Sequence, residues 1–136
     1  MDKEIQSELS SNGILRAAIN ISNFLLVTDK TKDGIPIGVS PDMANELANK
    51  LDLQLKLISY DTPGEIADDA GNDNWDICNI GAEPQRAEKI NFSAAYSEIQ
   101  ATYLIPPNSK LQNISEVDKT GNKIAVASRT AYGLWL

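Results

Sequence analysis

The segment from residue 14 to residue 57 constrains the fold most, because it alternates extended and helical patterns. A strand is predicted over Ile14–Ile21, which is apolar apart from two residues and follows the Asn12-Gly13 turn. A helix is predicted to begin at Ser40, where a capping serine precedes proline and aspartate, and one side of it carries Met43, Leu47 and Leu51, with Ala44 and Ala48 beside them. Leucines alternate with polar residues over 53–57, which indicates a second strand. A strand, a helix and a strand in succession predict a parallel pair in an α/β fold.

Further elements are predicted along the rest of the chain. They are, in order, a short helix around residues 65–70, a buried strand over 75–80, a helical turn after Pro84, a β-rich run over 99–105, a strand over 123–127 and a helix that begins after Ser128-Arg129-Thr130. Pro106-Pro107 indicates a boundary, because neither proline can donate a hydrogen bond to a sheet.

Composition excludes several classes of function. The chain has 136 residues, a net charge of −7 and no histidine, and its arginines are scattered, so nucleic acid is a poor candidate partner. Without histidine there is no Ser-His-Asp or Cys-His pair and no imidazole ligand for a transition metal. The lone Cys78 lies in an apolar run and is interpreted as a buried small hydrophobic residue. The acidic residues between 65 and 76 lack calcium-loop spacing and are interpreted as a solvated face, so we expect no metal and no cofactor.

The two ends of the sequence carry different patterns. Residues 1–13 are polar and mixed in charge, so no export signal is expected here, and no window is long and apolar enough for a membrane span. The sequence stops on Leu134-Trp135-Leu136, which indicates a truncated chain. We expect residues 120–136 to be ordered against a neighbouring molecule, in a homodimer or a domain swap, because their apolar side chains and strand edge lack a cover.

Arg86 is the most informative polar residue. It follows a predicted buried strand and a loop, and ligands of open α/β sheets bind at the carboxyl ends of strands. A guanidinium forks two hydrogen bonds to a carboxylate, so Arg86 suits recognition of a small organic acid or amino acid. Pairing with Glu83, three residues earlier, explains the same arginine equally well. The predicted helix start after Thr130 is a second, weaker candidate anion site.

Three motifs together carry a resemblance to a known family. They are residues 38–48 (GVSPDMANELA), Trp75-Asp76 and residues 83–96 (EPQRAEKINFSAAY). From about Ile14 to Thr130 the sequence resembles the bacterial extracellular solute-binding proteins of family 3, the amino-acid-binding components of ABC importers. The resemblance implies a three-layer α/β lobe of the type 2 periplasmic-binding-protein fold, in which helices flank a central mixed, largely parallel sheet. It also implies a periplasmic or extracytoplasmic location and a membrane permease as partner.

The same resemblance implies domains and site residues. Residues 1–106 would form the first lobe, and residues 107–136 the hinge and the beginning of a second lobe. The implied ligand-binding residues are Arg86 on the ligand's α-carboxylate, Asn79 and Gly81 beside it, Thr130 from the second lobe, and Asn23 or Phe24 lining the cleft. Gly81 and Glu83 depart from the family pattern, which often has Ser or Thr at the first position and Thr at the second. The acid that binds the ligand's amino group in the family would lie beyond residue 136.

Three functions are consistent with this resemblance. The first is a solute-binding module without catalytic residues, which closes around a small carboxylate-bearing ligand. The second is an enzyme on the same fold, such as a cyclohexadienyl dehydratase, with a cleft carboxylate such as Glu83 as general acid. The third is the sensor domain of a receptor. The absence of histidine favours the first.

Overall fold

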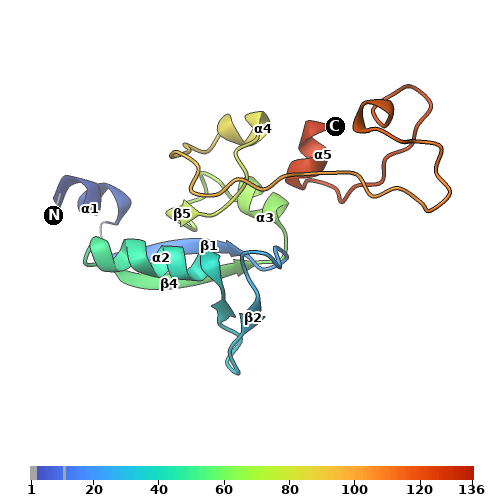
Figure 1. Cartoon of the computed structure of the whole chain (residues 1–136). Coiled ribbons are helices and arrows are strands. Elements are labelled where there is room, and N and C mark those ends of the chain that lie inside the picture. Colours follow the sequence, from blue (N-terminus) through green and yellow to red (C-terminus); the bar gives the residue numbers. More distant parts are fainter. Residues whose placement is uncertain (1–2, 11) are drawn as a thin grey trace.

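The main sheet of the chain has three parallel strands in the order β4-β1-β5 (Figure 1). A computed structural model describes residues 3–10 and 12–136. The strands are β1 (Ile14–Asn20), β4 (Gln54–Tyr60) and β5 (Ile77–Cys78). The predicted parallel pair is confirmed, since β1 and β4 pair in register from Ile14 opposite Gln54 to Asn20 opposite Tyr60. β1 is the central strand, as its long apolar run predicted.

Helix α2 (Val39–Lys50) covers one face of this sheet. Its buried side is made of small residues, chiefly Ala44 and Ala48, which pack against Leu15, Ala17 and Ile19 of β1. The predicted stripe is therefore only partly right: Leu51 is buried, Leu47 is half-buried and Met43 is 42% exposed. The alanines predicted beside the stripe make the contact instead of Met43, because small side chains allow the helix to approach the strands closely.

The predicted start of α2 is corrected by two residues. Gly38 is the N-cap, and Ser40 is buried in the first turn without capping the helix. Gly38 has a φ of 141° and lies so close to the Leu26 carbonyl that an added Cβ would stand 2.5 Å from its oxygen. Only glycine fits this close approach and this backbone conformation.

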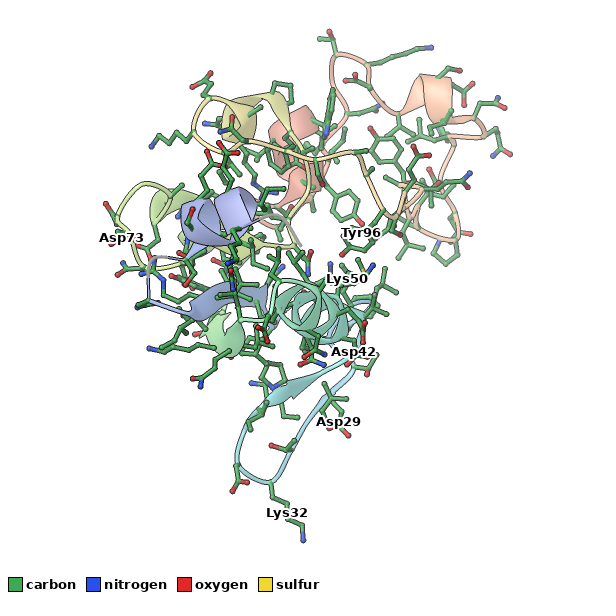
Figure 2. All side chains as sticks on the ribbon, turned by 90° about the vertical axis from the view of Figure 1, so that its left-hand side faces the viewer. Asp29, Lys32, Asp42, Lys50, Asp73 and Tyr96 are labelled. Atoms are coloured by element: carbon green, nitrogen blue, oxygen red, sulfur yellow. The ribbon has the colours of Figure 1, made fainter. Side chains whose placement is uncertain are left out.

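The other face of the sheet is partly covered by α3 (Pro63–Asp68) and the acidic segment that follows it, while Gln54 and Lys56 of β4 stay exposed. Thr62 and Glu65 form a capping box at the start of α3, and Ile66 is fully buried. In Figure 2, Asp73 lies on the opposite side of the strands from α2, which carries the labelled Asp42 and Lys50. The helix predicted around 65–70 is confirmed in place, with both ends shifted towards the N-terminus.

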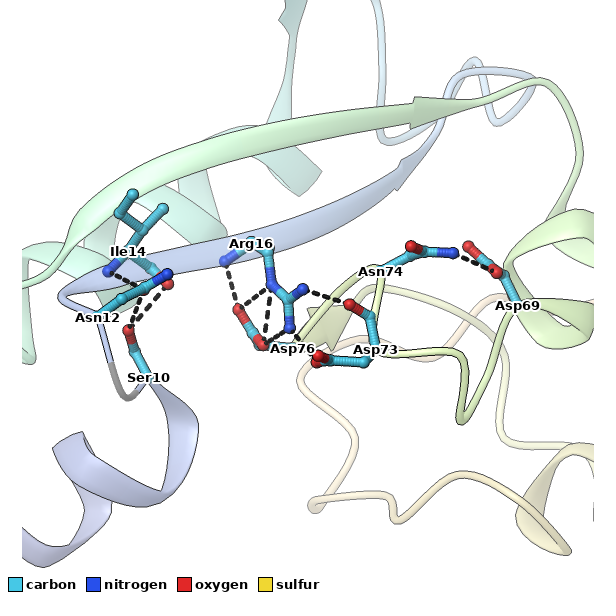
Figure 3. A network of polar contacts seen from close by, with 8 residues as sticks. All are labelled: Ser10, Asn12, Ile14, Arg16, Asp69, Asp73, Asn74 and Asp76. Atoms are coloured by element: carbon cyan, nitrogen blue, oxygen red, sulfur yellow. Dashed lines mark hydrogen bonds and ion pairs between the residues drawn. The ribbon is translucent and has the colours of Figure 1, made fainter.

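Arg16 ties this acidic segment to β1 (Figure 3). Its guanidinium contacts Asp76 at 2.5 Å and Asp73 at 2.7 Å, and its backbone N–H donates to Asp76 at 2.7 Å. Burial raises the pKa of Asp76, but the hydrogen bonds and charge of Arg16 outweigh this, so that the net pKa lies below its usual value. Asp69 accepts hydrogen bonds from Tyr60 and Asn74. Part of the acidic segment predicted to be solvated therefore holds the fold together.

Two shorter elements complete the packed region. Strands β2 (Asp29–Lys30) and β3 (Pro36–Ile37) form an antiparallel hairpin, whose tip carries Lys32 and projects away from the sheet (Figure 2). The predicted helical turn after Pro84 is confirmed as α4 (Pro84–Ala87). The remaining helix of this part is α1 (Lys3–Leu9), and no helix among residues 3–10 and 12–136 is long and apolar enough to cross a membrane.

β5 is shorter and less buried than predicted. The strand covers only Ile77–Cys78 of the expected residues 75–80, and both residues are half-buried. Cys78 is therefore less enclosed than its apolar neighbours suggested. Burial still raises the pKa of its thiol to about 11, so the thiol is a poor nucleophile at neutral pH.

The C-terminal segment, residues 93–136, is mostly irregular. It contains a turn of 3₁₀ helix, η1 (Ile114–Glu116), and a final short helix, α5 (Ala131–Trp135). The strands predicted over 99–105 and 123–127 are wrong, because the structure assigns no strand there. Figure 1 shows this segment, in orange and red, extending to one side of the sheet, where no strand lies in position to pair with it.

Candidate ligand-binding site

The order of the strands creates a switch point beside β1. The chain passes from β1 through α2 to β4 on one side, and from β4 through α3 to β5 on the other side of β1. The strand order therefore reverses between β1 and β5, and open α/β sheets bind ligands outside the carboxyl ends of their strands at such a point. Four of the predicted site residues lie just beyond the carboxyl ends of β1 and β5: Asn23, Phe24, Asn79 and Gly81.

The loop after β1 is held by the side chain of Asn23. Its Oδ1 accepts a hydrogen bond from the N–H of Leu25 at 3.2 Å, and its carbonyl accepts from the N–H of Leu26 at 3.0 Å. Phe24 is 78% exposed on this turn. Of the two residues proposed to line the cleft, Asn23 shapes the loop and Phe24 offers a free aromatic ring.

Asn79 connects the end of β5 to the start of α2. Its Nδ2 donates to the carbonyl of Ser40 at 3.0 Å and to the Ser40 hydroxyl at 2.9 Å. The N–H of Ser40 in turn donates to the carbonyl of Leu26 at 3.0 Å. The loops after β1 and β5 thus meet at the first turn of α2. Sequence reasoning missed this role of Ser40, because the serine before proline indicated an N-cap.

Arg86 is buried, at 4% exposure, and its guanidinium is bonded to its own chain. Its Nη1 lies 2.5 Å from Oε2 of Glu83 and donates to the carbonyl of Gly81 at 3.3 Å, while Nη2 donates to the carbonyl of Arg129 at 3.1 Å. Burial lowers the pKa of Arg86, and the charge of Glu83 opposes this shift. Pairing with Glu83, one of the two explanations of Arg86, is therefore present in the structure.

Within residues 3–10 and 12–136, the Nε of Arg86 is one of two buried side-chain nitrogens without a hydrogen-bond partner; the other is Nε1 of Trp75. A guanidinium has five N–H donors, and buried donors are normally satisfied. Arg86 therefore retains donor capacity for a further acceptor. The Trp75 nitrogen lies before β5, in the loop that follows α3, and belongs to no predicted site.

Gly81 and Glu83 form one structural feature. A Cβ added at Gly81 would stand 2.2 Å from Oε1 of Glu83, so a side chain at residue 81 and the observed position of Glu83 exclude each other. Glu83 is only 3% exposed. The two departures from the pattern of the resembling family are therefore coupled: the glycine makes room for the carboxylate.

Residues 129 and 130 bring the C-terminal segment to this site. The side chain of Arg129 donates to the carbonyl of Gly64 at 2.7 Å and pairs with Asp68 of α3. Its backbone adopts a positive φ of 61°, and its carbonyl faces Arg86. Thr130 is the N-cap of α5, as predicted, and its hydroxyl accepts from the N–H of Gly133 at 3.4 Å. The structure thus gathers Gly81, Glu83, Arg86 and residue 129, with Thr130 adjacent in the chain.

Comparison with known proteins agrees with this architecture. The model of the bacterial extracellular solute-binding proteins, family 3, matches residues 16–128. No curated protein sequence matches the chain.

Solved structures show the same fold. A crystal structure of an ancestral cyclohexadienyl dehydratase is similar with a TM-score of 0.59 and 23% identity, over 68% of this chain and 38% of that one. A crystal structure of an ancestral amino-acid-binding protein, a precursor of cyclohexadienyl dehydratase, also has a TM-score of 0.59 and 23% identity, over 68% and 41%. An ancestral cationic amino acid solute-binding protein is similar with a TM-score of 0.56 and 23% identity, over 66% of this chain and 39% of that one. The sequence thus spans about two fifths of these structures. Because the family model matches most of its length, the chain belongs to the bacterial extracellular solute-binding proteins of family 3.

Proposed function

We propose that this chain takes part in capturing a small ligand with a carboxylate group, in first place an amino acid, at the carboxyl ends of β1 and β5. The observation that carries the proposal is Arg86, a buried guanidinium beside a topological switch point, with a donor that its own chain leaves without a partner. Membership of the solute-binding family supports a binding function. The ancestral amino-acid-binding proteins with this fold favour an amino acid as the ligand.

The proposed mechanism is closure of two lobes around the ligand. Residues 1–106 contribute the first lobe, and residues 107–136 contribute the hinge and the beginning of the second. Arg86 binds the carboxylate, Asn79 and Gly81 flank it, Phe24 or Asn23 lines the cleft and Thr130 approaches from the second lobe. The ligand drives closure because it binds the closed form more tightly. The ligand-loaded protein then delivers its cargo, outside the cytoplasm, to the permease of an ABC importer.

Arginine-to-lysine replacement tests this proposal. Arg86→Ala would leave the buried Glu83 without a counter-charge and would destabilise the fold, whereas Arg86→Lys keeps the charge and removes the forked donors. We expect calorimetry of the full chain to show a loss of about tenfold to a hundredfold in affinity for its best amino acid. Arg16→Lys is the matched control, since Arg16 binds carboxylates away from the site. Equal affinity in Arg86→Lys and the unaltered chain would remove Arg86 from the site.

An enzyme is the second candidate, because a buried carboxylate, Glu83, lies in the site and one similar structure is an ancestral cyclohexadienyl dehydratase. In that case Glu83 would act as general acid on a cyclohexadienyl acid. Incubation with such an acid and detection of the aromatic product separates the two candidates. Binding without product supports the transport function, and turnover that Glu83→Gln abolishes supports the enzyme.

We also propose that residues 120–136 mediate self-association. Tyr132, Trp135 and Leu136 are 51%, 69% and 57% exposed, and large exposed apolar groups favour association. Size-exclusion chromatography with light scattering should therefore show a homodimer. A monomer at high concentration, with a tail that protease removes freely, would contradict this proposal.

A further inference from the structure

Glu83 and Arg86 form a buried pair of opposite charges inside the proposed site. Glu83 is 3% exposed and Arg86 is 4% exposed, and their nearest atoms are 2.5 Å apart. A buried charge that loses its partner is strongly destabilising, because neither water nor an opposite charge then compensates it. A ligand that separates this pair must therefore supply a new partner to each side chain.

The local structure is built around the carboxylate of Glu83. Its Oε1 takes the space in which a side chain at residue 81 would lie, since a Cβ there would stand 2.2 Å away. The carbonyl of Gly81 also accepts a hydrogen bond from Nη1 of Arg86, so the glycine, the glutamate and the arginine share one site. This coupling distinguishes the pair from an incidental surface ion pair, because the position of Glu83 requires a glycine at residue 81.

The class of ligand follows from the charge balance. A plain carboxylic acid brings only a negative charge, so when it binds Arg86 two carboxylates share one guanidinium and one buried negative charge has no counter-charge. An amino acid is a zwitterion: its carboxylate replaces Glu83 on Arg86, and its ammonium group replaces Arg86 on Glu83. The site then remains neutral, and the Nε of Arg86 gains an acceptor.

We propose that Glu83 receives the ammonium group of the ligand while Arg86 receives its carboxylate, so that this pair selects amino acids over the same acids without an amino group. The inference rests on the function proposed above and goes one step further. It places a partner for the ligand's amino group within this chain, in addition to any acid beyond residue 136. One carbon atom separates the ammonium group of an amino acid from its carboxylate. Charged hydrogen bonds of roughly 2.7–2.9 Å allow these two groups to form a ring of alternating charges with Glu83 and Arg86.

The test compares an amino acid with its desamino acid, in which hydrogen replaces the ammonium group. The best-bound L-amino acid is found by a thermal-shift screen, and both compounds are titrated into the full chain by calorimetry. Glu83→Gln removes the charge but retains the shape of the side chain. Gly81→Ala leaves the charge but displaces the carboxylate from its position, because the added Cβ would stand 2.2 Å from Oε1 of Glu83. Glu88→Gln is the matched control, since Glu88 is an exposed glutamate at the end of α4.

We expect the unaltered chain and Glu88→Gln to prefer the amino acid by at least about tenfold, the effect of one charged hydrogen bond. Glu83→Gln and Gly81→Ala should each lose most of this preference, and their affinity for the desamino acid should stay equal or rise. Circular dichroism shows whether each variant folds. If Glu83→Gln does not fold, the preference for the amino acid is compared between Gly81→Ala and the unaltered chain. A preference that persists in a folded variant, or equal affinities in the unaltered chain, overturns the inference but leaves the proposed function standing. If the unaltered chain binds neither class of compound, the proposed function itself fails.

Discussion

Leu15 and Leu104 are the same residue type in stretches with similar β-forming patterns, yet they have opposite environments. Leu15 on β1 is fully buried, at 0% exposure, whereas Leu104 in the C-terminal segment is 100% exposed. The difference lies in their neighbours: β1 is flanked by two strands and covered by α2, while residues 99–105 have no strand beside them. A β pattern therefore becomes a strand only where another strand satisfies its backbone hydrogen bonds.

The comparison extends to the two regions as a whole. Residues 14–92 contain the sheet and the two clusters of buried apolar residues. In residues 93–136 only Val117 is buried. The polar contacts of Arg129 with α3 and with Arg86 anchor this segment to the first region. Since buried contacts determine how strongly a region resists opening, the two regions should differ in local stability.

The largest expected effect is a cavity in the sheet region. Leu15→Ala removes a fully buried side chain from the cluster with Ala48, Leu51 and Leu53, and should destabilise the fold by about 2–5 kcal/mol. Leu104→Ala is the matched control and should change the free energy of unfolding by less than about 0.5 kcal/mol. Urea denaturation measures both. Equal losses at the two sites would show that the C-terminal segment packs as tightly as the sheet.

A second effect concerns the bond between Arg16 and Asp76. Asp76→Asn removes a mostly buried charged partner of Arg16 and should cost about 1–3 kcal/mol at neutral pH. Because the pKa of Asp76 is lowered in the folded state, its contribution is present above the unfolded-state value, about 3.9, and disappears as the pH falls through the lower folded value. Unfolding measured from pH 7 to pH 2 should therefore show a flatter acid limb in Asp76→Asn. An unchanged limb would mean that Asp76 does not stabilise the fold through its charge.

A third and smaller effect tests the contact between the two regions. Arg129→Ala removes the ion pair with Asp68 and the bond to Gly64, but both charged side chains are at least half exposed, so the loss should stay below about 1 kcal/mol. The local effect should be clearer, because the C-terminal segment loses an anchor. Hydrogen exchange of residues 127–133 should accelerate while that of β1 stays constant. Unchanged exchange at 127–133 would show that other contacts hold this segment.

The smallest effect is expected in the irregular part of the C-terminal segment. Ile99→Ser replaces an apolar residue that is 49% exposed and should alter the free energy of unfolding by less than about 0.5 kcal/mol. Thermal melting of the monomeric protein at low concentration is the measurement. A loss above about 1 kcal/mol would reveal packing of residues 99–105 against the rest of the chain.

Part of the candidate site was accessible from the sequence. A loop after an apolar strand predicted the position of Arg86, and the Glu83–Arg86 spacing offered the pair that the structure contains as one of two explanations. The hydrogen bond from Asn79 to Ser40 and the anchor from Arg129 to α3 were not accessible, because they join residues far apart in the chain. The coupling of Gly81 to Glu83 required coordinates too, since only the distance between them shows that one excludes a side chain at the other.

The sequence by itself determined the central strand, the parallel pair, the helix between its strands and the turn that carries Arg86, because these depend on local periodicity and short connections. The tertiary structure decided which apolar segments became strands and which charged residues were buried. Residues 99–105 and 123–127 are irregular because no partner strand lies beside them, and the acidic segment packs against β1 through the ion pair of Asp76 with Arg16. The physical reason is that sheet hydrogen bonds and buried ion pairs join residues that are far apart in the chain, and local sequence patterns do not predict such contacts.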